Sequence, residues 1–537
     1  MIARKMTMLK RRELFHFVGA ATLMASGVGN AIAAATKRFQ HYPFDPIAAE
    51  NFQQNLFIPV DSGPFGILDV TGPLTMRATP GSLSLLPGKP SPFLLYQTEQ
   101  SGKSYQNPIL RMNSGDKLKL TLRNELTEPT IIHWHGLQTP SKMDGHPAST
   151  IDAGKTFDYE FKVLSRGGTY WYHTHAHNLT AKQAYNGLAS FFLVDDEDQR
   201  KLNQTLDLKL GETDLPLVIQ DKQFNAQGQL RYQPNGQEAM MGWLGDVILA
   251  NLTPNAALKV LPRTYRLRIL NGSNARIYRL AFVKDKERLG FTVIGTDGGL
   301  IESPQSATEA FVAPGERLDI LFDAGQAQAG EEVFLKSLSF DPMENEGDAG
   351  SMPGMGSSTS RLEIGADFNI LKLTVGAGER VINKLPSALS RIATIPLKGA
   401  NQRSIKLSLR GMDFLINGRK FNMDENAFDV KRGTREVWTI SNPKVGMPHP
   451  IHLHGFSFQV LERMNSPRQI RALAKFGKGL TVSDLGWKDT VLIWPGESVR
   501  IVIDFSHDFP GDQVFMVHCH NLEHEDAGMM INYRVTG

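Results

Sequence analysis

Three segments of the chain share one pattern of polar and apolar residues, a glycine-centred turn followed by alternation. They are residues 151–161, 312–322 and 494–504. A second shared element, also alternating, lies upstream of each, at residues 116–124, 264–271 and 434–442. Alternation at a period of two predicts half-buried β-strands, and long stretches with the helical period are scarce. The repetition predicts an all-β fold of three consecutive Greek-key β-sandwich domains.

The domain boundaries follow from the repeats and from the composition between them. We expect the three domains at residues 40–197, 205–377 and 400–537. A polar stretch at 195–203 and a stretch punctuated by glycine and proline at 376–402 predict linkers. Residues 341–360 are rich in Gly, Ser and Met, which predicts a mobile loop.

Residues 1–35 are expected to be a cleavable export signal. Basic residues open the segment, an apolar run interrupted by Gly and Ser follows, and small residues of the Ala-x-Ala type end it. Arg11 and Arg12 resemble the pair of a twin-arginine signal, although Lys10 stands where Ser or Thr is usual, so an ordinary secretory signal is the alternative. We therefore expect a periplasmic or secreted protein.

Composition and charge exclude several classes of partner. At 537 residues, with 41% hydrophobic and 21% charged residues, the chain has the composition of a soluble multidomain protein. The formal net charge of the whole chain is +3, and residues 1–33 alone carry +4. The rest of the chain therefore has a net charge near −1. A net charge near −1 offers no positive excess that would attract nucleic acid or anionic lipid. We expect no membrane span after removal of the signal, and a monomer. The single cysteine excludes an internal disulfide.

Ten of the fifteen histidines fall into four clusters, two in the first predicted domain and two in the third. They are His133 and His135; His173 and His175; His449, His452 and His454; and His518, His520 and His524. On a strand, residues i and i+2 point to the same side, so each His-x-His pair presents two imidazoles to one place. One such pair is more often a surface or core feature, but four pairs in two copies of a repeat favour metal ligation.

The last cluster indicates which metal is bound. Cys519 lies between His518 and His520, so on a strand it faces a different site from theirs. Together with His449, His524 and Met529 it supplies a thiolate, two imidazoles and a thioether. That is the ligand set of a blue copper centre with a weak axial methionine. An electron accepted beside Cys519 can then pass along the backbone to the histidines on either side.

With these residues the chain resembles the multicopper oxidases, and specifically three-domain laccase-like enzymes of the bacterial periplasm. The resemblance covers essentially all of the chain after the expected signal. It implies cupredoxin-like domains, four copper ions, and one-electron oxidation of a small reducing substrate coupled to four-electron reduction of dioxygen to water. It implies type 1 ligands at His449, Cys519, His524 and Met529, type 2 ligands at His133 and His452, and type 3 ligands at His135, His173, His175, His454, His518 and His520. His177 is not at a ligand position.

Two acidic residues resemble the proton relay of that family. They are Asp144, which precedes Gly145, and Glu525, which follows His524. The alternative is that Asp144 is only a turn residue and Glu525 only a solvated neighbour. We favour the relay, because a buried carboxylate beside a metal is costly unless it has a role.

The reducing substrate is predicted from what the third domain lacks. Residues 486–490 and 523–530 resemble bacterial cuprous oxidases, which carry a Met-rich insert early in that domain, but residues 407–418 contain no insert. Met447 is present, whereas Val445 stands where those enzymes place an acid. We expect an uncovered type 1 edge and oxidation of phenols or aromatic amines.

Two alternatives remain open at this point. The first is a periplasmic cuprous oxidase in copper tolerance, with the loop methionines Met343, Met352 and Met355 replacing the missing insert. The second is a copper-binding or structural cupredoxin protein without activity. Relatives of the structural kind lose the histidine clusters and the cysteine, and this sequence retains them all.

Overall fold

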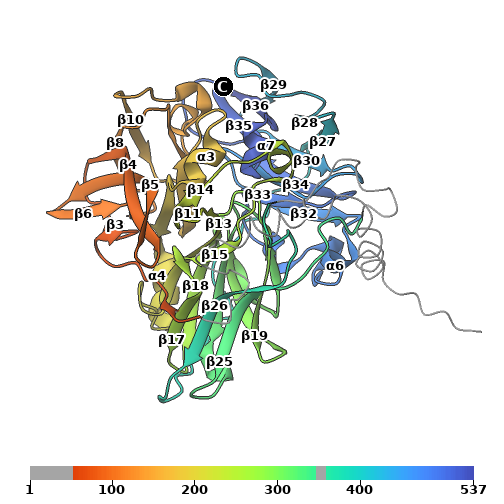
Figure 1. Ribbon diagram of the computed structural model, residues 1–537. Coiled ribbons are helices and arrows are strands. Elements are labelled where there is room, and N and C mark those ends of the chain that lie inside the picture. The colour runs from red at the N-terminus through yellow and green to blue at the C-terminus, as the bar shows by residue number, and fades with distance from the viewer. Residues whose placement is uncertain (1–51, 346–358) are drawn as a thin grey trace, which may run out of the picture.

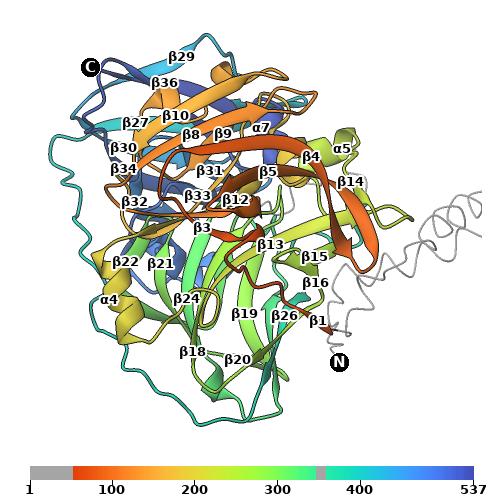
Figure 2. The same ribbon diagram turned by 90° about the vertical axis from the view of Figure 1, so that its left-hand side faces the viewer.

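The protein is built almost entirely from β-strands, as predicted. The computed structural model describes residues 52–345 and 359–537. Strands make up 47% of it and helices 10%, which confirms the all-β class and the cupredoxin-like architecture. The first and third domains lie side by side above the second (Figures 1 and 2). The expected export signal, and Met352 and Met355, lie outside the described residues.

The first domain is a sandwich of two sheets. One sheet has the order β10 (Thr156–Lys162), β8 (Lys117–Asn124), β4 (Leu74–Leu86), β5 (Lys89–Gln100), β6 (Lys103–Gln106) and β2 (Gly63–Pro64). The other has the order β3 (Ile67–Asp69), β7 (Ile109–Asn113), β12 (Ala189–Asp195), β11 (Gly168–Thr174) and β9 (Ile132–His135). Buried and exposed residues alternate along β8, whereas β9 and β11 are buried on both faces. These two strands therefore lie between domains.

The second domain is also a two-sheet sandwich, and it takes in the first strand of the described chain. Its first sheet has the order β1 (Gln54–Asn55), β17 (Ala256–Val260), β26 (Phe368–Val375), β25 (Glu332–Ser337), β19 (Tyr278–Lys284) and β20 (Glu287–Leu289), with β23 (Ala310–Val312) beside β19. Its second sheet has the order β16 (Thr253–Pro254), β15 (Val247–Ala250), β13 (Asp214–Phe224), β18 (Thr264–Asn271), β24 (Arg317–Asp323), β21 (Phe291–Thr296) and β22 (Gly299–Ala307), with β14 (Leu230–Arg231) beside β13. Because β1 pairs with β17, a segment that precedes the first domain in sequence belongs to a sheet of the second domain.

The third domain repeats the arrangement with two five-stranded sheets. One has the order β28 (Asp413–Ile416), β27 (Asn401–Arg410), β30 (Arg435–Ser441), β34 (Ser498–Asp504) and β32 (Phe458–Met464). The other has the order β29 (Asn426–Lys431), β36 (Met530–Thr536), β35 (Gln513–Cys519), β31 (His449–Leu453) and β33 (Thr490–Ile493). A separate hydrophobic core fills each of the three sandwiches.

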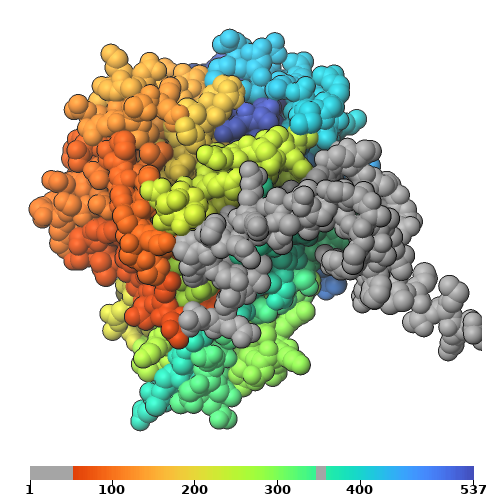
Figure 3. Space-filling model, viewed as in Figure 1, coloured from red at the N-terminus to blue at the C-terminus, as the bar shows by residue number. Residues whose placement is uncertain are grey.

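Short helices connect the strands and line the domain interfaces. They are α3 (Thr180–Tyr185), α4 (Glu197–Thr205), α5 (Gly236–Met241), α6 (Arg468–Arg471) and α7 (Leu522–Asp526), with 3-10 turns η1 (Ser141–Met143), η2 (Pro147–Ser149), η3 (Ala324–Gln326), η4 (Gly477–Gly479) and η5 (Val482–Asp484). The polar stretch predicted as a linker overlaps α4, which the Asp196 side chain caps by accepting from the Gln199 N–H. Helix α5 packs against α7, so the second domain meets the third there (Figure 3). In the described part of the chain, no helix is long and apolar enough to cross a lipid bilayer.

Candidate metal centre

The predicted histidine pairs lie on, or one residue beyond, four strands that meet between the first and third domains. In the first domain β9 pairs with β11, which places His133 opposite His173. In the third domain β31 pairs with β35, which places His452 opposite His518. The rings of His133 and His452, from different domains, have centroids 5.5 Å apart. The structure therefore brings the four His-x-His pairs to one interface, whereas His449 and His524 lie apart from them, beside Cys519.

His133 and His452 face each other through their Nε2 atoms. His133 Nδ1 donates to the backbone carbonyl of Asp144 at 2.7 Å, and His452 Nδ1 donates to that of Asp489 at 2.9 Å. With the protons on Nδ1, the Nε2 lone pairs of both rings point at each other across 3.3 Å. Two acceptors in a buried site at that distance are unfavourable unless a cation lies between them. The pair fits a metal ion held by two imidazoles.

A second group consists of His175, His454 and His518. The Nε2 atom of His518 lies 2.9 Å from that of His454 and 3.4 Å from that of His175. Outside this triad, Asp144 accepts from His454 Nδ1 at 2.7 Å. Glu525 oxygens lie 3.2 Å from His518 Nδ1 and 3.5 Å from His175 Nε2. The two acids predicted as a proton relay thus contact candidate ligands directly.

A third group consists of His135, His173 and His520. His135 directs Nε2 at Asp489, and His173 Nδ1 donates to the backbone of Thr174, so one nitrogen on each ring is free to bind a metal. Those nitrogens, His135 Nδ1 and His173 Nε2, have no hydrogen-bond partner in the described structure, and neither nitrogen of His520 has one. Such orphaned buried nitrogens fit a metal ion.

Cys519 lies on the other side of its strand, in a separate site. Its Sγ atom is 3.4 Å from His449 Nδ1 and 3.6 Å from His524 Nδ1. Met529 is fully buried beside them, and its backbone carbonyl accepts from the Cys519 N–H at 3.0 Å. One thiolate and two imidazoles beside a buried methionine match the ligand set of a blue copper centre.

Burial prepares these side chains for ligation. It lowers the pKa of His173 to about 3 and that of His175 to about 4, so both imidazoles are neutral near pH 7. Burial also raises the pKa of the Cys519 thiol well above its usual range. Cys519 therefore carries its proton until a metal ion displaces it.

The two acids differ in their electrostatics. Burial raises the pKa of Asp144 well above its usual range. Burial acts in the same direction on Glu525, but the nearby His175 and His518 outweigh it and lower the pKa of that carboxyl. Neither oxygen of Glu525 has a hydrogen-bond partner among the described residues. Both carboxyls are about 1% exposed, so Glu525 is not the solvated neighbour of the alternative interpretation.

Some residues of the site were not predicted from sequence. Asp489 Oδ1 lies 3.0 Å from His135 Nε2 and 3.6 Å from His452 Nδ1, and this residue belongs to the segment 486–490, which resembles bacterial cuprous oxidases. Trp171 stacks on His173 with centroids 4.2 Å apart, and Phe414 stacks on His524 at 3.9 Å. Trp171 pairs with His135 across two strands, and Asp489 precedes Thr490, which pairs with His452; those positions are the signal that could have found them. Phe414 lies on β28, which pairs with β27, and its sequence position gives no such signal. His177 is exposed, as expected for a residue that is not a ligand.

The edge of the Cys519 site is not uncovered, contrary to the prediction. Helix α5 of the second domain lies over it, and His524 Nε2 donates to the carbonyl of Met240 at 3.0 Å. Beside this cover a cavity of about 340 Å³ reaches His449. The prediction was wrong because it considered an insert in the third domain only, whereas the cover comes from the second.

The comparisons with known proteins agree with this geometry. Three family models described as multicopper oxidase match residues 97–199, 171–341 and 394–537. The chain is 33% identical to multicopper oxidase mco of Staphylococcus haemolyticus over 80% of this chain and 82% of that one. It is 31% identical to a laccase of Bacillus subtilis over 75% of this chain and 78% of that one. The crystal structure of McoA multicopper oxidase from Aquifex aeolicus superposes with a TM-score of 0.79 at 37% identity, covering 90% of this chain and all of that one.

Proposed function

Because the chain belongs to the multicopper oxidases, copper-dependent oxidoreductases that use dioxygen, we propose that it oxidises small electron-rich phenols or aromatic amines. Members of this family carry four copper ions, at one type 1, one type 2 and two type 3 sites. Copper bound at these sites supplies one-electron redox chemistry and reduction of dioxygen to water.

The proposed ligands are those of the sequence prediction. The type 1 site consists of His449, Cys519, His524 and Met529; the type 2 site of His133 and His452; and the type 3 sites of His135, His173 and His520 on one side and His175, His454 and His518 on the other. The facing Nε2 atoms and the orphaned ring nitrogens support this division.

The residues on either side of Cys519 support the proposed direction of electron flow. His518 and His520 flank Cys519 on one backbone segment, and each belongs to a different type 3 triad. The substrate therefore gives up electrons near His449 and His524 without reaching the place where dioxygen binds.

The observation that carries the substrate proposal is the cavity beside His449. Its volume is about 340 Å³, and no charged side chain is found among the described residues that line it. Val445 and Phe414 contribute apolar surface to it. A neutral, largely apolar cavity of this size favours a small aromatic molecule over a hydrated metal cation.

A second candidate substrate is Cu(I), because the same cavity is rich in thioethers. Met240, Met241, Met412 and Met447 all line it, and thioethers are ligands that Cu(I) prefers. These methionines replace the loop methionines of the sequence prediction, of which Met352 and Met355 lie outside the described residues. A periplasmic cuprous oxidase in copper tolerance is therefore the competing proposal.

One experiment separates the two substrates. The copper-loaded, dialysed enzyme is assayed for oxygen uptake with a methoxyphenol and, separately, with Cu(I). We expect phenol oxidation without added copper, and we expect Met240→Leu with Met412→Leu to leave it within about two-fold. Met464→Leu, on β32 away from the cavity, is the control. If phenol oxidation needs excess copper and the double variant selectively loses Cu(I) oxidation, the protein is a cuprous oxidase and the phenol proposal is wrong.

Three further elements belong to the proposal. Asp144 and Glu525 hand protons from solvent towards the cluster, which is supported by their contacts with His454, His518 and His175. Residues 1–35 direct export to the periplasm or medium. The mature protein acts as a monomer with dioxygen and a small reducing substrate, without nucleic acid.

A further inference from the structure

One turn of the second domain contacts the cluster, although that domain holds none of the proposed ligands. The turn joins β23 to β24, and Gly315 at its centre has a φ of +82°. A Cβ atom placed on Gly315 would lie 2.9–3.0 Å from ring atoms of His520. The backbone of the second domain therefore packs against an imidazole of one type 3 triad.

Arg317, two residues further on, connects all three domains through its guanidinium group. Nε donates to the Thr169 carbonyl of the first domain at 3.0 Å. One terminal nitrogen donates to the Gly315 carbonyl at 2.8 Å and to Asp489 Oδ1 at 2.9 Å. The other donates to the Asp297 carbonyl at 3.1 Å and to Asp489 Oδ2. All five N–H donors are used in a group that is 1% exposed.

Asp489 carries this constraint to the ligands. Its Oδ1 atom accepts from His135 Nε2 at 3.0 Å, and its backbone carbonyl accepts from His452 Nδ1 at 2.9 Å. A proton on Nε2 of His135 leaves Nδ1 as the atom that faces His173 and His520. The bidentate pair with Arg317 holds the Asp489 carboxylate in the plane that selects this tautomer and ring orientation.

The three carboxylates at the cluster therefore differ in kind. In the described structure, ion pairs of Asp144 and Glu525 involve histidines alone, whereas Asp489 has a guanidinium partner. Two hydrogen bonds from Arg317 hold the Asp489 carboxylate in one orientation and favour its ionised form. Such a group is suited to positioning a ligand histidine rather than to proton transfer.

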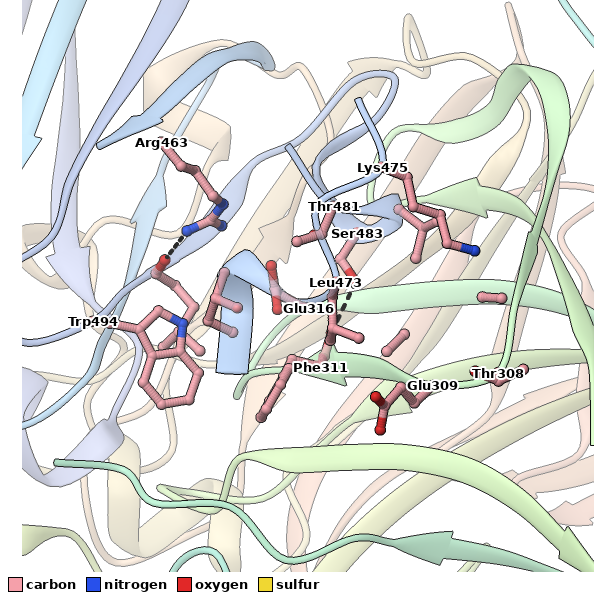
Figure 4. A pocket seen from close by; sticks show the side chains of 15 residues that line it. Thr308, Glu309, Phe311, Glu316, Arg463, Leu473, Lys475, Thr481, Ser483 and Trp494 are labelled. Atoms are coloured by element: carbon pink, nitrogen blue, oxygen red, sulfur yellow. Dashed lines mark hydrogen bonds between the residues drawn. The ribbon is translucent and has the colours of Figure 1, made fainter. Parts of the chain in front are cut away.

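The neighbouring charges reinforce the same contact. Lys488 binds Glu316 at 3.0 Å and Asp297 at 2.9 Å, so the pair Lys488–Asp489 meets the pair Glu316–Arg317 with opposite charges matched. Glu316 also borders a cavity of about 50 Å³ between the second and third domains (Figure 4). Two adjacent ion pairs fix the register of the turn against the segment 486–490.

We propose that Arg317 is a positioning residue for oxygen reduction: it holds Asp489, and through Asp489 it aligns the type 3 triad His135, His173 and His520. The proposal rests on the ligand assignment above. It gives the copper-free second domain a part in building one half of the cluster, while the other half, at His175, His454 and His518, lies outside the reach of Arg317.

The test is Arg317→Gln in the full-length, copper-loaded enzyme. We expect the blue absorption of the Cys519 site to remain and anaerobic bleaching by a phenol to proceed normally. We expect copper per chain to fall from four towards three, the near-ultraviolet absorption of the coupled pair to be lost, and reoxidation in air to slow about 10- to 100-fold. Asp489→Asn should give the same signature, and the double variant should be no worse than either single one.

Arg266→Gln is the matched control. Arg266 is fully buried in the same sheet and binds Asp319, but it contacts no proposed ligand. It should lower the unfolding temperature without changing copper content or reoxidation. Should Arg317→Gln not fold, Arg317→Lys, which keeps the charge but not the planar fork, should show the same losses in milder form.

Two outcomes would overturn the proposal. One is Arg317→Gln, or Arg317→Lys in its place, with four copper ions and normal reoxidation; the other is copper loss of equal size in Arg266→Gln. His135→Ala, measured in parallel, separates this failure from failure of the ligand assignment. If His135→Ala keeps its full copper content, the ligand assignment is wrong. If His135→Ala loses copper but Arg317→Gln keeps it, the ligand assignment stands and the positioning role of Arg317 is wrong.

Discussion

Replacing Asp144 by asparagine is the substitution that isolates a proton-relay role. The Asp144 side chain accepts from His454 Nδ1 at 2.7 Å, whereas its backbone carbonyl accepts from His133 Nδ1 at the same distance. Asparagine leaves the backbone contact intact and keeps an oxygen for His454. What it removes is the charge and the capacity to take up and release a proton.

The magnitude follows from those contacts. A hydrogen bond to a charged acceptor contributes about 1.5–3 kcal/mol, and a neutral one about 0.5–1.5 kcal/mol. For the ionised carboxyl, losing the charge therefore costs about 1–2 kcal/mol at His454, which corresponds to a rate loss of roughly 5- to 30-fold if the step it serves limits turnover. The same cost is too small to expel copper, since the ligand itself is unchanged.

The assay is oxygen uptake across a range of pH, with copper content and blue absorption measured on the same sample. We expect four copper ions per chain in Asp144→Asn and slower turnover. The deficit should grow as pH rises, because the wild-type carboxyl can collect scarce protons from solvent and the amide cannot. Thr139→Val is the control: its hydroxyl lies 3.5 Å from Asp144, at the limit of a hydrogen bond, so its removal should change turnover by less than about two-fold.

Two results would refute this reasoning about Asp144. Wild-type turnover at every pH would remove the relay role. Loss of copper from Asp144→Asn would show instead that the carboxylate mainly holds His454 in place, and the relay would then rest on Glu525 alone.

Four other predictions concern the copper sites. Cys519→Ser should abolish both the blue absorption and all substrate oxidation, and a blue, active variant would contradict the assignment. Met529→Leu should keep the colour and raise the reduction potential measured by redox titration, because a weak axial donor is removed; an unchanged or lower potential would mean that Met529 is not axial. His135→Ala should bleach with substrate but stay bleached in air, whereas prompt recovery would place oxygen reduction elsewhere. Removing copper by chelation should lower the unfolding temperature measured by calorimetry, because copper binds the folded state. Equal unfolding temperatures with and without copper would mean that copper does not bind the folded state preferentially.

The all-β fold and the clustering of the candidate histidines could be predicted from the sequence because both depend on local rules. A period of two places His133 and His135 on one side of β9, and their rings lie with centroids 5.7 Å apart. The same rule places Cys519 opposite its neighbours. The repeat of turn and strand predicted the all-β sandwich class, since each sandwich must bury one face of every strand.

The remaining features depend on contacts between residues that are distant in sequence. Arg317 and Asp489 are 172 positions apart, and Met240 and His524 are 284 apart. The Gly315–Arg317 turn has the same local sequence pattern as the turns of the other two domains. Nothing in the sequence therefore indicated that this turn contacts the cluster. The cover over His524 was missed for a related reason: a short helix with two methionines acquires its role only when domains pack.

The distribution of contacts explains how one segment can serve two sites without mixing them. Cys519 Sγ packs in the core of the third domain with His449 and His524, and the rings of His518 and His520 lie on the opposite side, towards the first domain. His518 joins the triad bordered by Asp144 and Glu525, and His520 joins the triad bordered by Asp489. In the proposed assignment, an electron leaving Cys519 has a short covalent path to either half of the cluster, while the two halves keep different surroundings. One half is bordered by acids without a fixed cation, which suits proton delivery, and the other by an acid locked to Arg317, which suits rigid ligand geometry.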